Sequence, residues 1–519
     1  MSAGLYPIST FTLNTANQAI APAPRRPLIL AQGTSAGSFT SGALVQNISN
    51  DLNTAKDLCG GGSIGQIMID AFKEENPFSP LDVIIVSDNG SGVAATGTIV
   101  FTATPTASGT LYVTIGSYIN NRYEIPVTTS STPTTLGDAL AAAILADVYS
   151  PVTSVNTTGS VALTAKSKGT EGNGIGLRVE GTVAGVSVAL TAFASGATDP
   201  SLTGVLTKID ESRYDIITEL AFLTPVKAHL EPKFNSTNQV LDGIAFVTNM
   251  DTYANLQTAL APGTLASQVI QYTCNKKIND ADWKGGALLE LNYALSARLG
   301  ALRALRFVPN AILNSFMVAG NNRGGIALAS VPYHNMKLNN VTTIPTGKNF
   351  LQTEAIALGD LGGTTLSMDS SGTVTVTNPF WLTCYKAATP TAIGSTYSTV
   401  NRNDTATTAR EYIFRNMKEN FAQYALTSGT IPAAPGILIA NEKSIKAYLV
   451  GLWNDLYQLG ILQGGVTDDG TDLQDLFTQN LIVNVDTSAG SVTGSMAIIV
   501  MGQLTSFDFD ITPNSSPNQ

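Results

Sequence analysis

Near its N-terminus the chain alternates strand, helix and strand, and this order restricts its fold more than any other feature. Leu28–Gln32 and Val83–Val86 are short apolar runs of the kind found in buried strands. Between them, Asn53–Glu75 has helical periodicity interrupted by three glycines, and Ser63 is placed to cap the second part of the helix. A strand–helix–strand order is typical of a parallel sheet with a crossover helix, so the sequence predicts an α/β core.

The composition changes between residues 88 and 198. This stretch is rich in Gly, Thr, Ser and Val, carries few charges, and consists of strand-like runs around one alanine-rich helix, Leu136–Asp147. Strands of the buried type resume at Asp215–Thr218, Gly243–Val247 and Val269–Tyr272, with helices between them. The sequence therefore predicts a β-rich domain inserted into an α/β domain.

A long helix is predicted from Ala287 to Arg306, with a leucine stripe along one side. Arg298, Arg303 and Arg306 are predicted to lie on its solvated flank. Residues 341–377 are expected to be loop-like until a strand begins near residue 373. An amphipathic helix follows at Ala406–Leu426.

The C-terminal stretch combines one helix with late strands. An apolar stripe from Ile445 to Leu459 predicts the helix, Asn441 stands at its N-cap position, and Gly460 is placed to end it. Leu481–Val485 and Met496–Met501 are predicted strands. So small a unit leaves strand edges open, and open edges favour pairing with another chain.

The two ends of the chain are also expected to need a partner. Residues 1–24 carry no charged side chain, cannot build a core of their own, and include an alternating apolar run. A second alternating run ends the chain. The apolar residues predicted to face a partner are Ile8, Phe11, Leu13, Phe507, Phe509 and Ile511.

These patterns predict a mixed α+β and α/β multidomain fold, with a parallel-type core, an inserted β-rich domain, a C-terminal helix-plus-strands unit and extended terminal arms. The expected domains are an arm (1–24), an α/β core (25–87 and 199–345), the insertion (88–198) and a C-terminal assembly domain with a terminal strand (346–519).

Bulk composition argues against several classes of function. Charged residues make up 13% of the chain, the net charge is −10, and no basic cluster occurs, so nucleic acid is not expected as a direct partner. No uncharged apolar run approaches the ~20 residues of a membrane span, and no signal peptide is predicted. Cys59, Cys274 and Cys384 are widely separated, which favours reduced, buried thiols in a reducing compartment; an intermolecular disulfide is the alternative.

No motif in the sequence specifies catalysis, a metal site or a cofactor. Gly33–Gly37 fits the GxSxG pattern of a nucleophile elbow, but no helix starts at Ser35, and His229 and His334 are the only histidines. The glycine-rich stretch Lys168–Gly176 lacks the ending of a phosphate-binding loop. Asp468–Asp472 is too short for a calcium loop. Turns are the expected structure for all three motifs.

Several stretches resemble the tail sheath proteins of contractile bacteriophages, in the Mu-like branch. Leu58–Phe72, followed by Asn76-Pro77 and the strand at residues 83–86, matches the glycine-serine start, helix and strand of that family. Residues 95–116 resemble the opening of its inserted domain, and residues 151–173 resemble the second half. The resemblance covers most of residues 25–200 and rests mainly on the order of elements beyond them.

The resemblance implies a structural subunit that polymerises helically around an inner tail tube and contracts to drive the tube through the host envelope. Neighbouring subunits would be tied by strands donated from the N- and C-terminal arms. The implied partners are further copies of the chain, the tail tube protein, and baseplate and tail terminator proteins. The implied location is the virion tail, assembled in the host cytoplasm, without membrane insertion.

Two other classes stay open on the sequence alone. One is an α/β hydrolase-like enzyme with a β-rich accessory domain, and the other is a carbohydrate-binding or adhesin module.

Overall fold

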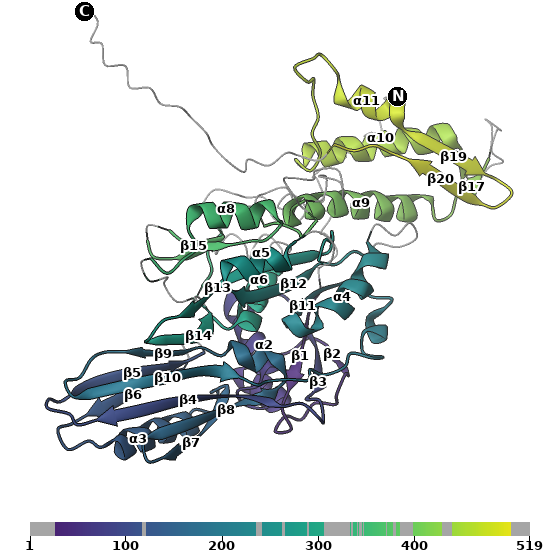
Figure 1. Ribbon diagram of the computed structural model, residues 1–519. Coiled ribbons are helices and arrows are strands. Elements are labelled where there is room, and N and C mark those ends of the chain that lie inside the picture. The colour runs from purple at the N-terminus through teal and green to yellow at the C-terminus, as the bar shows by residue number, and fades with distance from the viewer. Residues whose placement is uncertain are drawn as a thin grey trace, which may run out of the picture.

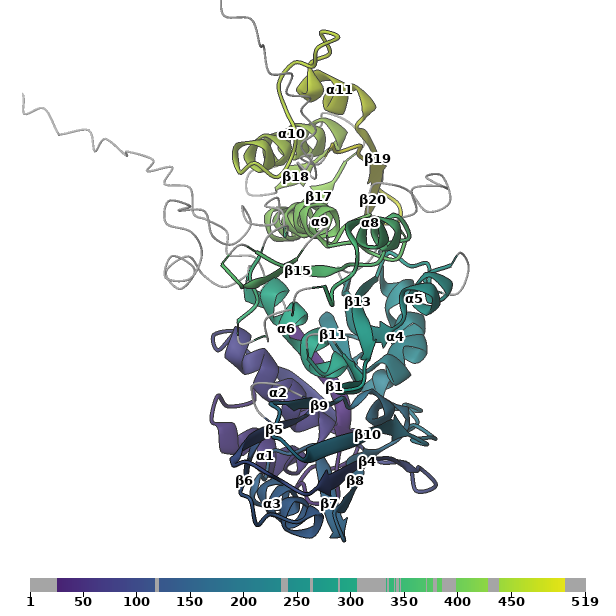
Figure 2. The same ribbon diagram turned by 60° about the vertical axis from the view of Figure 1, so that its left-hand side comes forward.

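A computed structural model shows an elongated molecule with the inserted strands at one end and the C-terminal helices at the other (Figures 1 and 2). The structure describes residues 26–116, 121–234, 241–261, 265–287, 290–305, 347–369, 371–376, 380–384, 398–427 and 438–499, together with 333, 336–339, 341 and 345.

Three units follow one another along the molecule. The core unit contains β1 (Arg26–Gly33), β2 (Leu44–Val45), α1 (Leu52–Cys59), α2 (Ile64–Glu75), β3 (Asp82–Ser87), β11 (Tyr214–Thr218), α4 (Leu223–Leu230), β12 (Ala245–Asp251), α5 (Tyr253–Ala259), β13 (Ile270–Asn279), β14 (Trp283–Ala287) and α6 (Asn292–Leu305). The inserted unit contains β4 (Ala94–Ala103), β5 (Gly109–Ile115), β6 (Arg122–Val127), α3 (Pro133–Ala146), β7 (Val152–Thr157), β8 (Ser160–Lys168), β9 (Leu177–Glu180) and β10 (Val186–Ala194). The C-terminal unit contains α8 (Gln352–Asp360), β15 (Leu366–Met368), β16 (Val374–Val376), α9 (Val400–Phe421), β17 (Ala425–Leu426), β18 (Ile439–Ala440), α10 (Glu442–Gln458), α11 (Leu473–Asn480), β19 (Ile482–Asp486) and β20 (Ser491–Ser495).

A ten-stranded sheet extends through the core unit and into the inserted unit, with the strand order β2-β3-β1-β11-β12-β13-β14-β9-β5-β6. Its centre is parallel: β1 pairs with both β3 and β11, and β11, β12 and β13 continue in the same direction. The predicted strand–helix–strand order is confirmed by β1, α2 and β3. Ser63 caps α2 as expected, since its Oγ accepts a hydrogen bond of 3.2 Å from the backbone N–H of Gln66.

The parallel strands are covered on both faces, because alternate residues of each strand enter different apolar clusters. In β1, Ile29 and Ala31 pack with α2 and α6, whereas Leu28 and Leu30 pack with α4 and α5 on the opposite face. All four side chains are fully buried. The near-continuous apolar sequence of β1 follows from this double burial.

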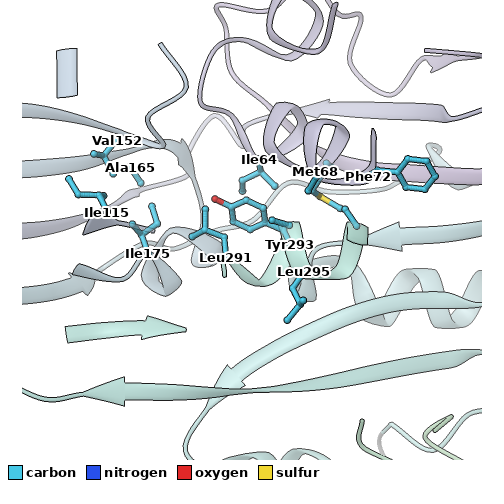
Figure 3. Close-up of a cluster of buried hydrophobic side chains, with 14 of the residues drawn as sticks. Ile64, Met68, Phe72, Ile115, Val152, Ala165, Ile175, Leu291, Tyr293 and Leu295 are labelled. Carbon is cyan, nitrogen blue, oxygen red and sulfur yellow. The ribbon is translucent and has the colours of Figure 1, made fainter. Parts of the chain in front are cut away.

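The inserted unit is joined to the core unit through both a sheet and a shared core. β4, β7, β8 and β10 form their own four-stranded sheet, but β9 pairs with β14 of the core unit, placing Trp283 opposite Arg178. The side chain of Tyr293 on α6 lies among Ile64 of α2 and Ile175 of the inserted unit (Figure 3). The strand order therefore runs unbroken from one unit into the next.

The C-terminal unit departs from the sequence expectations at three places. Within residues 341–377, predicted to be loop-like, α8 occupies Gln352–Asp360. The helix predicted at 406–426 starts six residues earlier, at Val400, where Thr399 caps it. The strand predicted at 496–501 is absent from its described residues 496–499, and β20 forms at Ser491–Ser495 instead.

Replacing a helical glycine by alanine is expected to have opposite effects on stability at two positions, Gly300 and Gly451. Gly300 of α6 faces β11, and a Cβ there would lie 2.5 Å from Cδ1 and Cγ1 of Ile217. We expect Gly300→Ala to lower the free energy of unfolding by about 1–3 kcal/mol through overpacking.

Gly451 of α10 is the matched control, since nothing lies within 4 Å of its added Cβ. Gly451→Ala should raise stability by about 0.5–1 kcal/mol through helix propensity. Urea denaturation of both variants measures the difference, and equal effects would contradict the packing of α6 on β11.

Candidate assembly site

The GxSxG-like stretch Gly33–Gly37 contains a turn at Ser35, as the sequence predicts. Ser35 is exposed in the turn that follows β1, and no hydrogen bond joins its side chain to a described histidine or carboxylate. His229 is occupied elsewhere: its Nδ1 lies 3.3 Å from Oδ1 of Asp210 and its Nε2 2.9 Å from Nζ of Lys233. Burial, followed by the charge of Lys233, lowers the pKa of His229 to about 4. His334 lies outside the described residues.

The other motifs also form local structure. Residues 170–174 of the glycine-rich stretch form a short 3₁₀ helix (Thr170–Gly174), and the acidic stretch forms a turn in which Asp472 caps α11. Among the described residues, no three His, Cys, Asp or Glu side chains are grouped to hold a metal ion. Cys59, Cys274 and Cys384 are buried free thiols.

This arrangement predicts that Ser35 has no chemical role. Ser35→Ala should leave folding and assembly unchanged, and a fluorophosphonate probe should not label the wild-type chain. Mass spectrometry of the peptide containing Ser35 checks the second point. Covalent labelling of Ser35 that disappears in the variant would revive the hydrolase interpretation.

The prediction of a solvated arginine flank on α6 is wrong for Arg298 and Arg303, which are 1% and 0% exposed. Nε of Arg298 donates to Glu290 at 2.7 Å, and its Nη2 donates to Glu74 at 2.7 Å. Arg306 lies outside the described residues. The remaining positions of α6 offered a signal: they are mostly Ala, Ser and Gly, and a helix that is small or apolar all round is a buried helix.

Arg303 is the centre of a buried network that joins the core unit to the C-terminal unit. Its Nε and Nη2 donate to Oδ1 of Asp404 on α9 at 2.9 and 2.6 Å, and its Nη1 forms an ion pair with Asp215 on β11. The hydroxyl of Tyr333 donates to Oδ2 of Asp404 at 2.7 Å. Because Asp404 is 0% exposed, both carboxylates and the guanidinium depend on one another for their charge stabilisation.

Two further ion pairs attach α9 to the core unit. Nη1 of Arg213 lies 2.6 Å from Oε2 of Glu411, and Nη2 of Arg410 lies 2.5 Å from Oδ2 of Asp242. Together with Arg303–Asp404, these contacts fix α9 along about two turns of its length. We call these three ion pairs the α9 clamp.

The α9 clamp predicts a large stability cost when its buried cation is removed. Arg303→Met removes the guanidinium that pairs with both Asp404 and Asp215, and we expect the free energy of unfolding to fall by about 3–5 kcal/mol. Lys446→Ala is the matched control, because Lys446 pairs with Glu442 on the exposed side of α10 at 2.8 Å.

The control should lose no more than about 0.5 kcal/mol. Denaturant unfolding followed by circular dichroism measures both. A loss below about 1 kcal/mol for Arg303→Met would contradict a coupled buried network.

Beyond the α9 clamp, the C-terminal unit presents a hairpin with open edges. β19 and β20 form a two-stranded antiparallel sheet in which Asn484 lies opposite Thr493. Every residue of β20 is exposed, and no further described strand pairs with either outer edge. Such edges present unpaired backbone N–H and C=O groups to another strand.

A compact apolar core holds this hairpin in place. α10 starts at the predicted cap, since Asn441 Oδ1 accepts from the N–H of Ser444 at 2.9 Å. Trp453 of α10 stacks on Phe477 of α11 with ring centroids 5.7 Å apart, and Val483 of β19 is buried in the same cluster. The hairpin therefore packs on α10 and α11 through buried apolar side chains.

The residues predicted to pair between subunits lie outside the described residues, so their pairing stays a prediction: Ile8, Phe11, Leu13, Phe507, Phe509 and Ile511. Among the helices that the structure describes, none is both long and apolar enough to cross a membrane.

The geometry defines a multi-unit α/β protein with a buried ionic joint and an open sheet edge. No family model matches the chain. Over 240 residues it is 29% identical to the tail sheath protein of a Mu-like prophage, FluMu, of Haemophilus influenzae, a match covering 44% of this chain and 48% of that protein. The match thus spans about half the length of the relative, and it confirms the resemblance to Mu-like tail sheath proteins.

Solved structures match the chain with TM-scores below 0.5. The sheath tail protein of Desulfitobacterium hafniense has a TM-score of 0.42 and 10% identity, covering 92% of this chain and 97% of its own. The helical sheath of the anti-feeding prophage in its contracted state has a TM-score of 0.46 and 10% identity, covering 95% of this chain and 94% of its own.

Proposed function

We propose that this chain is a subunit of a contractile tail sheath, which polymerises helically around an inner tail tube and contracts to drive the tube through the host envelope. The observation that carries the proposal is the 29% identity to a Mu-like tail sheath protein. The open hairpin β19–β20 supports it, because a single heterologous contact repeated without closure builds a helix.

The α9 clamp supports the mechanical part of the proposal. Contraction by a switch between two packings requires subunits that transmit force without deforming. Buried ion pairs between α6, β11 and α9 couple the C-terminal unit to the core unit at short distances. Tension applied at the hairpin then reaches the large sheet, while contacts between subunits change.

The proposal includes the donation of strands from the two ends of the chain to neighbouring subunits. The alternating runs around Ile8–Leu13 and Phe507–Ile511 would add strands to the sheets of neighbouring subunits. Each main-chain hydrogen bond adds about 0.5–1.5 kcal/mol net, and each buried phenylalanine adds about 1.5–3 kcal/mol. A strand of about five residues is thus strong enough to hold a repeated contact and weak enough to leave free chains monomeric.

The proposed setting follows from this role. Partners are further copies of the chain, the tail tube protein, and the baseplate and tail terminator proteins, in a virion tail assembled in the host cytoplasm. We infer that the chain is not an enzyme, since Ser35 lacks a base and His229 is engaged by Asp210 and Lys233. No specific observation favours the adhesin alternative.

Truncation tests the role of the ends. We expect deletion of residues 1–20, and separately of residues 505–519, to yield folded, soluble subunits that no longer assemble, because each deletion removes a donated strand. Circular dichroism checks folding, and sedimentation with negative-stain microscopy checks assembly. The full chain is expected to form hollow tubes or stacked discs, and the Ser35→Ala chain serves as the control that retains them.

Normal tubes from both truncated chains would contradict strand donation but leave the sheath role standing. The absence of tubes or discs from the full chain under all conditions, combined with labelling of Ser35, would contradict the sheath role itself.

A further inference from the structure

The carboxyl ends of β1 and β11 meet at a topological switch point. β1 continues through α1 and α2 toward β3, whereas β11 continues through α4 toward β12 on the other side. α2 and α4 also pack on opposite faces of the sheet. In open α/β sheets this position forms the crevice where ligands bind.

In this chain, residues of the inserted unit fill the crevice. The 3₁₀ helix Thr170–Gly174 of the inserted unit lies against residues 220–222, which directly follow β11. Oε1 of Glu171 accepts a hydrogen bond of 3.2 Å from the backbone N–H of Ala221. Oε1 of Glu219 accepts one of 2.6 Å from the N–H of Gln32 at the end of β1. Two glutamates from different units thus meet at the switch point.

Glu219 and Gln32 each have a buried oxygen without a hydrogen-bond partner. Glu219 is 1% exposed, and its Oε2 has no hydrogen-bond partner. The side chain of Gln32 is fully buried; its Nε2 donates to the carbonyl of Lys168 in the inserted unit at 3.0 Å, while its Oε1 is unpaired. A buried carboxylate oxygen without a donor is costly, and a proton on it removes that cost.

The surroundings supply more negative charge than positive. Asp199 accepts from the N–H of Thr170 at 2.6 Å, and Asn89 donates to the backbone carbonyl of Asp199 at 3.1 Å, so the two chain crossings into the inserted unit lie beside the glutamates. The titratable groups that act on Glu171, Glu219 and their neighbours are Asp88, Lys168, Asp199, Glu290 and Tyr293.

We propose that Glu171 and Glu219 form a protonated carboxyl latch, which docks the inserted unit on the core unit and loosens when both side chains ionise. The latch occupies the crevice that a ligand takes in other α/β sheets, so the site serves to hold the chain together. The inference concerns the single subunit and does not depend on assembly.

Burial, the first cause, and the neighbouring carboxylates raise the pKa of Glu171 to about 7 and the pKa of Glu219 well above its ordinary value. A carboxyl group whose folded-state pKa is raised binds a proton that the unfolded chain has already released. Its contribution is therefore complete below the ordinary pKa of 4.5 and is lost as the pH rises through the raised value. The stabilising contribution of Glu171 therefore falls between pH ~4.5 and pH ~7 and is lost above that range.

Hydrogen exchange of the full chain between pH 5 and 9 tests the latch. After correction for the intrinsic exchange rate, residues 170–174 and 219–222 of the wild type should exchange at least about tenfold faster at pH 9 than at pH 5, since a tenfold change corresponds to only one pKa unit of the rise in Glu171. Amides of β12 and α10 should change little. Glu171→Gln keeps an acceptor for the N–H of Ala221 but cannot ionise, so its protection should stay constant across this range.

Glu180→Gln, on the same unit but in partly exposed ion pairs with Arg122 and Arg178, is the control and should follow the wild type. Glu219→Gln provides a second variant, whose protection should resemble that of Glu171→Gln. If Glu219→Gln does not fold, the comparison of Glu171→Gln with the wild type is sufficient. Constant protection in the wild type, or the same loss of protection in Glu171→Gln, would overturn the proposal.

Discussion

The buried guanidinium of Arg303 is the interaction on which the arrangement of the units depends. Removing an arginine from water is expensive, and the cost is offset only when carboxylates and hydrogen bonds replace its hydration. Asp215 comes from the sheet, Asp404 from α9, and Tyr333 supports Asp404. Displacing α9 would leave these buried charges without one another, so the network opposes separation of the C-terminal unit from the core unit.

The inserted unit is attached by different chemistry. Its joint combines strand pairing between β9 and β14, shared apolar packing around Tyr293, and the pair Glu171–Glu219. Arginine keeps its charge at every physiological pH, whereas a buried carboxyl pair exchanges protons with the solvent. The two joints therefore differ in chemistry, since one is built on a guanidinium and the other on a pair of carboxyl groups.

The sequence was sufficient to predict those elements that are determined by residues close to one another in the chain. The apolar runs of β1 and β3, the cap at Ser63 and the cap at Asn441 depend on neighbours in sequence, and the structure confirms them. The burial of Arg303 depends on Asp404, 101 positions away, so a single-sequence periodicity placed it on a solvated flank. β20 escaped detection because Ser491–Ser495 is exposed on both sides and shows no alternation. The assembly residues at the chain ends stay predictions.

The polar sequence of β20 has a consequence for when its edge is used. Ser491, Thr493 and Ser495 lie on one face of β20 and Val492 and Gly494 on the other, and because all five are exposed, the strand has no buried side that specifies a single register. It also lacks the long apolar edge that drives indiscriminate aggregation of free subunits. In the proposed strand exchange, an incoming strand would therefore have to bring its own apolar side chains and its own alignment. The hairpin would then take its specificity from the segment that arrives.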